Sequence, residues 1–307
     1  MTKVFIDGSA GTTGLRIYER LSERKDLELI ILPDDIRKNP EARKDAIQKA
    51  DIAFLCLPDA AAIEAVELAE GSDTVIIDTS TAHRTNPDWA YGFPELTGKR
   101  EEIKQSKRIA NPGCHASGFI ALVEPLITKG ILSKDAKLTC FSLTGYSGGG
   151  KKMIAEYEAE DRDVLLDAPR QYGLTQQHKH LKEMQQITGL TTAPIFCPIV
   201  ADYYSGMEVT VGVFKEDLTG SIEDIKHIYQ EYYHSNIMRY VENPYESNYA
   251  SGNKLSSSDC MEVSVAGNED RILLIARFDN LGKGASGAAI QNMNIVMGVE
   301  EETGLSL

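Results

Sequence analysis

The stretch ANPGCHASG places a cysteine directly after a Pro-Gly turn and before a run of small and apolar residues. Asn111, Pro112 and Gly113 favour a turn, and the residues after Cys114 are typical of the start of a helix. A helix N-terminus carries partial positive charge, which stabilises a thiolate, the nucleophilic form of cysteine. The sequence therefore indicates a reactive cysteine at position 114, although position alone leaves a structural role equally open.

The other cysteines give no comparable signal. Cys56, Cys140 and Cys197 each lie in an apolar, strand-like run, where a free cysteine is usually a small buried hydrophobe, and Cys260 has no stronger claim. Five scattered cysteines without a C-x-x-C pair indicate neither a disulfide framework nor a zinc site. We therefore expect reduced thiols and no bound metal.

A cysteine that attacks an acyl carbon needs a proton donor, and histidine is the usual one. His178 and His180 form a polar pair in the stretch QQHKHLKE, for which solvated loop histidines are the alternative interpretation. His115 adjoins the cysteine, but consecutive side chains on a helix point about 100° apart, so we expect it to flank the site. The proton donor is therefore predicted among His178 and His180.

The chain opens on a strand, a glycine-rich turn and a helix. An apolar stretch at 3–6 is followed by glycines at positions 8, 11 and 14, and residues 15–25 have helical apolar spacing. Such glycines let backbone amides approach a pyrophosphate at the helix N-terminus. The spacing is G-x-x-G-x-x-G rather than G-x-G-x-x-G, but the strand before it and the helix after it favour a dinucleotide site.

The choice between the two nicotinamide cofactors stays open at this point. Asp34 or Asp35 would suit the ribose hydroxyl of NAD, whereas the basic residues that follow, Arg37, Lys38, Arg43 and Lys44, would suit the additional phosphate of NADP. A solvated loop and helix face explains most of these charges equally well.

Alternating apolar segments predict the architecture of the first part of the chain. Strands are expected at 27–32, 52–57 and 75–78, and helices at 41–49 and 60–69. This alternation is typical of a parallel sheet with right-handed crossovers.

A different pattern follows from about residue 137. Longer strand-like stretches are expected at 137–144, 192–200, 208–214, 261–266 and 271–278, with helical stretches at roughly 151–190 and 221–235. A last helix at 284–298 could return to the first domain. We therefore predict an α/β protein: a Rossmann-type parallel-sheet domain, residues 1–113 plus 284–307, and an α+β catalytic and dimerisation domain with a mixed or antiparallel sheet, residues 114–283.

Length and charge exclude several classes of function. The 307 residues, 42% of them hydrophobic, suffice for two domains, and the formal net charge of −14 argues against a nucleic acid or an anionic membrane as the main partner. The N-terminus lacks the zones of a signal peptide, and no apolar run approaches the roughly 18 residues of a membrane span. We expect a cytoplasmic protein.

Eight motifs together carry a family resemblance. In chain order they are GSAGTTG, FLCLPDAAA, IIDTSTAHR, YGFPEL, ANPGCHAS, TGYSGGGKK, HKHLKE and DNLGKGASGAAIQNMN, which span nearly the whole chain. The sequence resembles N-acetyl-gamma-glutamyl-phosphate reductases, most closely their shorter branch, and is more distantly similar to aspartate-semialdehyde dehydrogenases.

The resemblance implies an activity and its cofactor. It implies NADPH-dependent reduction of N-acetyl-L-glutamyl 5-phosphate to the 5-semialdehyde with release of phosphate, in arginine biosynthesis. It also implies a cytoplasmic homo-oligomer, a homodimer or a homotetramer, and it favours NADP(H) over NAD. Of the local basic residues, Arg37 is the one expected to bind the cofactor.

The resemblance also assigns residues. Cys114 matches the nucleophile, and the HKH stretch matches the position of the catalytic histidine. Lys182 stands where the longer branch has a proline, which weakens the choice between the two histidines, and we favour His180. The residues expected to bind the cofactor in the turn are Gly8, Ser9, Ala10, Gly11, Thr12, Thr13 and Gly14.

A substrate with a phosphate and a carboxylate requires basic side chains in a protein of this net charge. Arg84 closes the TSTAHR stretch after a predicted strand, at the end where open α/β sheets bind ligands. Lys151 follows a flexible polar loop that begins at Tyr146. The candidates for substrate binding are Arg84, Arg108, Tyr146 and Lys151, with Lys152 as a neighbour of the last.

Two other functions fit part of the same pattern. An aspartate-semialdehyde dehydrogenase-like enzyme would use the same chemistry on a shorter acyl phosphate with a free amine. A nucleotide-binding redox sensor would keep the fold and a reactive Cys114 without turnover, although a sensor needs no proton donor.

Overall fold

The computed structural model describes residues 1–307, which form two compact units. The first unit comprises Met1–Pro94, Gly98–Pro112 and Ala285–Leu305, and the second comprises Glu95–Thr97, Gly113–Gly284 and Ser306–Leu307. The chain passes between the units at 112/113 and 284/285, and also at 94/95, 97/98 and 305/306.

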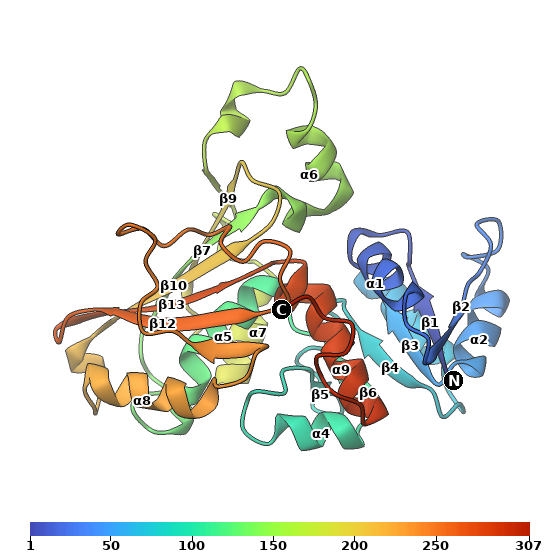
Figure 1. The fold of residues 1–307 in the computed structure, drawn as a ribbon, viewed down its shortest axis with the longest axis horizontal. Coiled ribbons are helices and arrows are strands. Elements are labelled where there is room, and N and C mark those ends of the chain that lie inside the picture. Colours follow the sequence, from blue (N-terminus) through green and yellow to red (C-terminus); the bar gives the residue numbers. More distant parts are fainter. The chain divides into compact units, whose positions relative to one another are not determined.

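The first unit is built on a parallel sheet of six strands in the order β2-β1-β3-β4-β6-β5 (Figure 1). Its strands are β1 (Thr2–Asp7), β2 (Leu27–Ile30), β3 (Ile52–Leu55), β4 (Val75–Asp78), β5 (Ala90–Tyr91) and β6 (Arg108–Ala110). Its helices are α1 (Thr12–Ser22), α2 (Pro40–Lys49), α3 (Asp59–Leu68), α4 (Lys99–Gln105) and α9 (Gly287–Met297). The predicted parallel sheet is confirmed.

Helices cover both faces of this sheet because its strands are apolar on both sides. Val4 and Ile6 pack in a core with Ile17 of α1 and Met293 of α9. Phe5, which points the other way, joins a second core formed with the small apolar side chains of α2 and α3. The carboxyl ends of the parallel strands therefore meet at one edge, where Asp7 and Asp78 end β1 and β4 and where such sheets bind ligands.

The second unit contains a mixed sheet of seven strands in the order β11-β12-β13-β10-β7-β9-β8. The pairs β7/β9 and β11/β12 are parallel and the other pairs are antiparallel, which confirms the predicted mixed sheet. The strands are β7 (Thr139–Gly145), β8 (Arg170–Gln171), β9 (Ile195–Ala201), β10 (Met207–Phe214), β11 (Met238–Tyr240), β12 (Met261–Gly267) and β13 (Arg271–Phe278).

The helices of the second unit are α5 (Cys114–Thr128), α6 (Gly150–Tyr157), α7 (His180–Thr188) and α8 (Ile222–Tyr232). Short 3-10 helices lie at Tyr146–Gly149, Val164–Asp167 and Lys215–Asp217, and a π-helical turn at Gly282–Ser286 precedes α9. None of the helices in the protein combines the length and the apolar character that a membrane span requires.

One predicted element was wrong. The stretch 151–190 is helical at its two ends, in α6 and α7, whereas its middle forms a 3-10 turn, the short strand β8 and connecting loops. Asp163 caps the 3-10 turn with its side chain, and Gly173 adopts a positive φ of 64°. These turn-forming residues interrupt the helix that the polar composition had suggested.

The central helix of the second unit, α5, is fixed on the sheet by close packing. A Cβ atom at Gly118 would lie 2.5 Å from Cγ2 of Val209 in β10, so glycine allows the helix to approach the strand. On the side of α8, the hydroxyl of Tyr233 donates to the carbonyl of Ala121 over 2.7 Å. The first residue of α5, Cys114, is thereby carried on a rigid element.

Candidate active site

Cys114 is the first residue of α5, as the sequence predicted. It is half-buried, and Gly113 before it is the N-cap residue and adopts an extended conformation. A Cβ atom at Gly284 would lie 3.0 Å from the Cβ atom of Cys114, so the π-helical turn before α9 presents bare backbone to the cysteine. The sulfur thus lies at the positive end of a helix dipole, a position that favours the thiolate.

Both predicted histidines lie in a cluster of rings beside this helix. The ring centroids of His115 and His180 are 5.6 Å apart, and those of His178 and His180 are 4.8 Å apart. Tyr172 belongs to the same cluster: its hydroxyl is 2.7 Å from Nε2 of His115. Burial raises the pKa of Tyr172, and the charge of Cys114 raises it further.

Tyr172 is the member of this cluster that the sequence analysis missed. It follows the two-residue strand β8 directly and is separated from His115 by 57 positions in the chain. The nearness of Tyr172 to the HKH stretch in sequence was the one signal that could have suggested it.

His115 is a structural neighbour of the cysteine. It is buried, and its Nδ1 is 2.6 Å from the hydroxyl of Ser142 while its Nε2 is bonded to Tyr172. Burial, reinforced by the charge of His178, lowers the pKa of His115 to about 3. It is therefore neutral at physiological pH, with both ring nitrogens engaged, and it joins α5 to β7 and to the Tyr172 segment.

The two histidines of the HKH stretch have different surroundings. His178 is half-buried, and its Nδ1 accepts a hydrogen bond from the backbone N–H of His180 over 3.2 Å. Burial, together with the charge of Lys179, lowers the pKa of His178. His180, the first residue of α7, is buried beside His115. Because His178 uses one nitrogen to hold the start of α7, the geometry favours His180 as the proton donor.

The glycine-rich turn of the first unit has the geometry that its spacing suggested. Gly8 has a φ of +89°, and a Cβ atom there would lie 2.3 Å from the carbonyl oxygen of Cys56. A Cβ atom at Gly14 would lie 2.4 Å from the carbonyl oxygen of Gly8, and Gly11 is the N-cap residue of α1. Any side chain at position 8 or 14 would therefore push the turn away from β3 or from α1.

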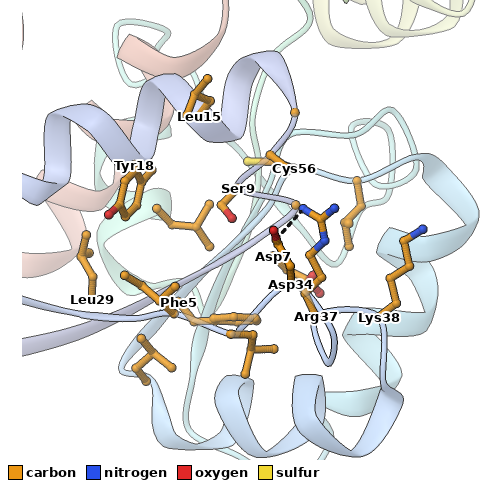
Figure 2. A pocket seen from close by; sticks show the side chains of 18 of the residues that line it. Phe5, Asp7, Ser9, Leu15, Tyr18, Leu29, Asp34, Arg37, Lys38 and Cys56 are labelled. Carbon is orange, nitrogen blue, oxygen red and sulfur yellow. Dashed lines mark ion pairs between the residues drawn. The ribbon is translucent and has the colours of Figure 1, made fainter. Parts of the chain in front are cut away.

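A cavity of about 520 Å³ opens beside this turn, a size typical of cofactor sites. Figure 2 shows the side chains of α1 and β2 around it and Arg37 near Asp34 at its edge. The lining residues are Phe5, Ile6, Asp7, Gly8, Ser9, Ala10, Gly11, Leu15, Tyr18, Leu29, Ile30, Ile31, Leu32, Asp34, Arg37, Lys38, Cys56, Leu57 and Pro58. Of the predicted cofactor ligands, Thr12, Thr13 and Gly14 lie behind this lining, in the first turn of α1.

The charged residues near the cavity separate into exposed and buried groups. Arg37 is exposed and lies 3.3 Å from a carboxylate oxygen of Asp34. Arg43 is buried, and its Nε donates to Asp7 over 2.9 Å. Arg37 and Lys38 are therefore the cations available to a ligand at this cavity, whereas Arg43 is bound within the first unit.

The candidate substrate residues of the first unit lie at opposite edges of its sheet. Arg84 follows the carboxyl end of β4, and its guanidinium donates to the carbonyls of Asn111 and Thr79, both over 2.9 Å. Arg108 begins β6 at the amino edge, where it donates to the carbonyl of Thr74 over 3.1 Å. We therefore retain Arg84 and leave Arg108 out of the site proposed below, because ligands bind at the carboxyl edge.

A buried hydrogen bond supports the loop that carries Arg84. Nδ1 of His83 is 2.7 Å from a carboxylate oxygen of Asp78, and the ring stacks on Trp89 with centroids 4.0 Å apart. These residues were not among the predicted site residues, although Asp78 and His83 lie within the IIDTSTAHR stretch.

The candidate substrate residues of the second unit lie on the segment around α6. Tyr146 stacks on Tyr157 with ring centroids 4.8 Å apart, and it packs in the same small core as Tyr172. Lys151 and Lys152 are exposed on the first turn of α6. Tyr146 thus packs the loop at 146–150 against the segment around Tyr172. The two lysines are accessible to an anion.

Family models match both parts of the chain. The model described as semialdehyde dehydrogenase, NAD binding domain, matches residues 33–106, and the model described as semialdehyde dehydrogenase, dimerisation domain, matches residues 114–280. Together with a parallel sheet whose first strand leads into a glycine-rich turn, and a helix that begins at a cysteine, these matches define an NAD(P)-dependent oxidoreductase of the semialdehyde dehydrogenase class.

Curated relatives narrow the class. N-acetyl-gamma-glutamyl-phosphate reductase 2 of Nostoc sp. is 42% identical over 99% of both chains, and the N-acetyl-gamma-glutamyl-phosphate reductase of Brucella suis is 46% identical over 96% of this chain and 99% of the relative. The chain therefore belongs to the N-acetyl-gamma-glutamyl-phosphate reductase family.

Solved structures agree on the fold. Aspartate semialdehyde dehydrogenase II of Vibrio cholerae, complexed with ASA, gives a TM-score of 0.72 at 16% identity over 97% of this chain and 98% of that chain. Aspartate semialdehyde dehydrogenase of Candida albicans, with NADP, gives 0.69 at 16% identity over 97% and 99%. At 16% identity these structures show that the fold is shared, and they do not identify the substrate of this chain.

Proposed function

We propose that this chain catalyses the NADPH-dependent reduction of N-acetyl-L-glutamyl 5-phosphate to N-acetyl-L-glutamate 5-semialdehyde and phosphate, in arginine biosynthesis. The observation that carries the proposal is Cys114 at the first position of α5, where the ring of the next residue, His115, lies 5.6 Å from that of His180, in a chain of this family. The required free thiol suits a reducing, cytoplasmic environment.

The first half of the proposed reaction forms a thioester on the enzyme. The sulfur of Cys114 attacks the acyl carbon of the substrate while His180 accepts the thiol proton. The bond between the acyl carbon and the phosphate oxygen breaks, and phosphate leaves with the electron pair and takes a proton from water. Arg84 and Lys151 are proposed to hold the charged groups of the substrate.

The second half releases the aldehyde. The cofactor, when bound, would supply a hydride to the thioester carbon, and its fit is supported by the cavity beside the Gly8 turn, where no side chain could be accommodated at position 8. The thiohemiacetal on Cys114, in its alkoxide form, then collapses: the aldehyde carbonyl forms, the carbon–sulfur bond breaks, and His180 returns the proton to sulfur. The neutral His115 and Tyr172 exclude water from one side of this site.

The reverse reaction tests the activity directly. Purified protein is mixed with N-acetyl-L-glutamate 5-semialdehyde, phosphate and NADP, with aspartate semialdehyde and NAD in parallel arms. We expect phosphate-dependent NADPH formation, followed by absorbance, at least about tenfold faster with the acetylated aldehyde. Faster turnover of aspartate semialdehyde would favour the related dehydrogenase, and tight NADP binding without turnover of either aldehyde would favour a redox sensor.

The preference for NADP over NAD is proposed to come from Arg37. Replacement Arg37→Ala removes a charge-assisted hydrogen bond to the additional phosphate, worth about 1.5–3 kcal/mol, so KM for NADPH should rise about tenfold or more while KM for NADH changes little. Steady-state kinetics with both cofactors checks this. Lys44→Ala, an exposed cation of α2 outside the cavity lining, is the control. An equal rise for both cofactors would contradict a phosphate contact.

We further propose that the chain forms a homodimer or homotetramer through the outer face of the seven-stranded sheet. The helices α5 and α8 cover the other face, whereas Phe141, Phe214 and Leu273 are large apolar side chains exposed on adjacent strands of the outer face. Exposed apolar groups of this kind mark interaction surfaces, and the residues lie within the matched dimerisation domain.

A further inference from the structure

A buried carboxyl group contacts the backbone directly before the nucleophile. Oε1 of Glu183 accepts a hydrogen bond from the backbone N–H of Gly113 over 2.8 Å, and Glu183 is 2% exposed. Glu183 lies on α7, 70 positions further along the chain than Gly113. The N-cap of the nucleophile's helix is therefore held by a side chain from another helix.

This contact replaces a local cap that α5 lacks. In a capping box, a Glu or Gln at the third helical position bonds back to the N–H of the N-cap residue. In α5 that position is Ala116, whose methyl group cannot accept a hydrogen bond, and the N-cap residue Gly113 has no side chain that could cap the helix. Glu183 performs the same task from α7.

The same helix carries the proposed proton donor. His180 is the first residue of α7, and Glu183 follows it by three positions, so both side chains lie on neighbouring parts of one helix face. The hydrogen bond to Gly113 thus ties α7 to the residue adjoining Cys114. Sliding α7 along α5 would break this bond and would change the distance between the imidazole and the sulfur.

Resting on the proposed function of Cys114, we propose that Glu183 is a positioning residue: its carboxyl oxygen holds the turn before Cys114 on the helix that carries His180. Burying a carboxyl group is costly unless the group is hydrogen-bonded. The hydrogen bond from Gly113 offsets part of this cost for Glu183. A displacement of about 1 Å between reacting groups can lower a rate about 10²-fold.

Three substitutions test the role through the acceptor atom. Glu183→Gln keeps an oxygen at the same reach, Glu183→Asp withdraws it by one methylene, and Glu183→Ala removes it. We expect kcat within about threefold of wild type for the Gln variant, a fall of about 10- to 100-fold for the Asp and Ala variants, and little change in KM for the semialdehyde. Glu216→Gln, at an exposed glutamate of the same unit, is the matched control.

A second readout is independent of turnover. The rate at which iodoacetamide alkylates Cys114, followed by mass spectrometry of its peptide, should change in the Asp and Ala variants and stay near wild type in the Gln variant. Any of three results would overturn the proposal: a wild-type kcat in the Asp variant, a Gln variant as slow as the Asp variant, or an effect confined to KM. If the Ala variant does not fold, as judged by circular dichroism, the Gln and Asp variants still decide.

These readouts separate the two proposals. Retained activity in a Cys114→Ser variant would refute the role of Cys114 as nucleophile. It would not affect the alkylation rates of Cys114 measured in the Glu183 variants. Unchanged alkylation and unchanged kcat in all folded Glu183 variants would refute the positioning role and leave the nucleophile intact.

Discussion

Replacement of Cys114 by serine should lower turnover at least about 10³-fold, because a catalytic nucleophile cannot be substituted by a group that ionises only at much higher pH. The serine hydroxyl keeps the size of the thiol at the start of α5, so the fold should persist. Binding of NADPH should change less than twofold, because every residue that lines the cavity at the glycine-rich turn lies between positions 5 and 58. The reverse assay and a fluorescence titration with NADPH measure the two quantities.

The matched control for this experiment is Cys197→Ser. Cys197 is also a half-buried free thiol of the second unit, in β9, but it lies in no proposed catalytic contact. Its variant should keep most of the wild-type rate. A Cys114→Ser enzyme with more than a few per cent of that rate would refute the thioester mechanism, even if the family assignment stood.

The local parts of the site could be predicted from the sequence. A strand, a glycine-rich turn and a helix follow one another within about 20 positions, so the roles of Gly8 and Gly14 are determined by neighbours in the chain. The same holds for Cys114, because the Pro-Gly turn directly precedes its helix.

Contacts between distant segments could not be predicted. Tyr172 meets His115, and Glu183 meets Gly113, across 57 and 70 positions. Glu183 belongs to the HKHLKE motif and Tyr172 lies near it, but nothing in the local pattern pairs either residue with its partner. Arg108 was named with Arg84 as a candidate on its charge alone, but the short strand β6, which the sequence did not reveal, places Arg108 at its amino end. Residues at strand ends therefore need the topology before they can be assigned to a site.

A buried arginine of the second unit was likewise invisible in the sequence. Arg277 of β13 is 2% exposed, and its guanidinium donates twice to Glu246, over 2.7 and 2.9 Å, and once to Glu262 over 3.3 Å. Arg239 bonds the second of these carboxylates, and Lys254 pairs with the first. This ion cluster joins the segment after β11 to the strands β12 and β13 of the sheet.

Arg277→Met should lower the free energy of unfolding by about 3 kcal/mol at pH 7, because removing the buried partner leaves the two carboxylates only partly compensated, by Arg239 and Lys254. Differential scanning calorimetry of the variant measures the loss as a lower unfolding temperature. Glu223→Gln, which breaks the exposed pair with Lys226, should cost less than about 1 kcal/mol and is the control. A loss no larger than that of the control would show that the cluster contributes nothing beyond a surface pair.

The loss should also depend on pH in a defined direction. Burial raises the pKa of Glu246, but hydrogen bonds from Lys254, Arg277 and the N–H of Ser251 outweigh it and lower the pKa to about 2. A carboxyl group whose pKa is lower in the folded than in the unfolded state stabilises the fold above the unfolded value, near 4.5, and this contribution disappears as the pH falls toward 2. The difference in the free energy of unfolding between wild type and Arg277→Met should therefore be largest at neutral pH. It should shrink below about pH 4.5, because protonated Glu246 carries no charge for Arg277 to compensate. Urea unfolding at pH 7, 5, 4 and 3 measures it, and a difference that stays constant over this range would mean that the arginine stabilises the sheet by packing rather than by charge.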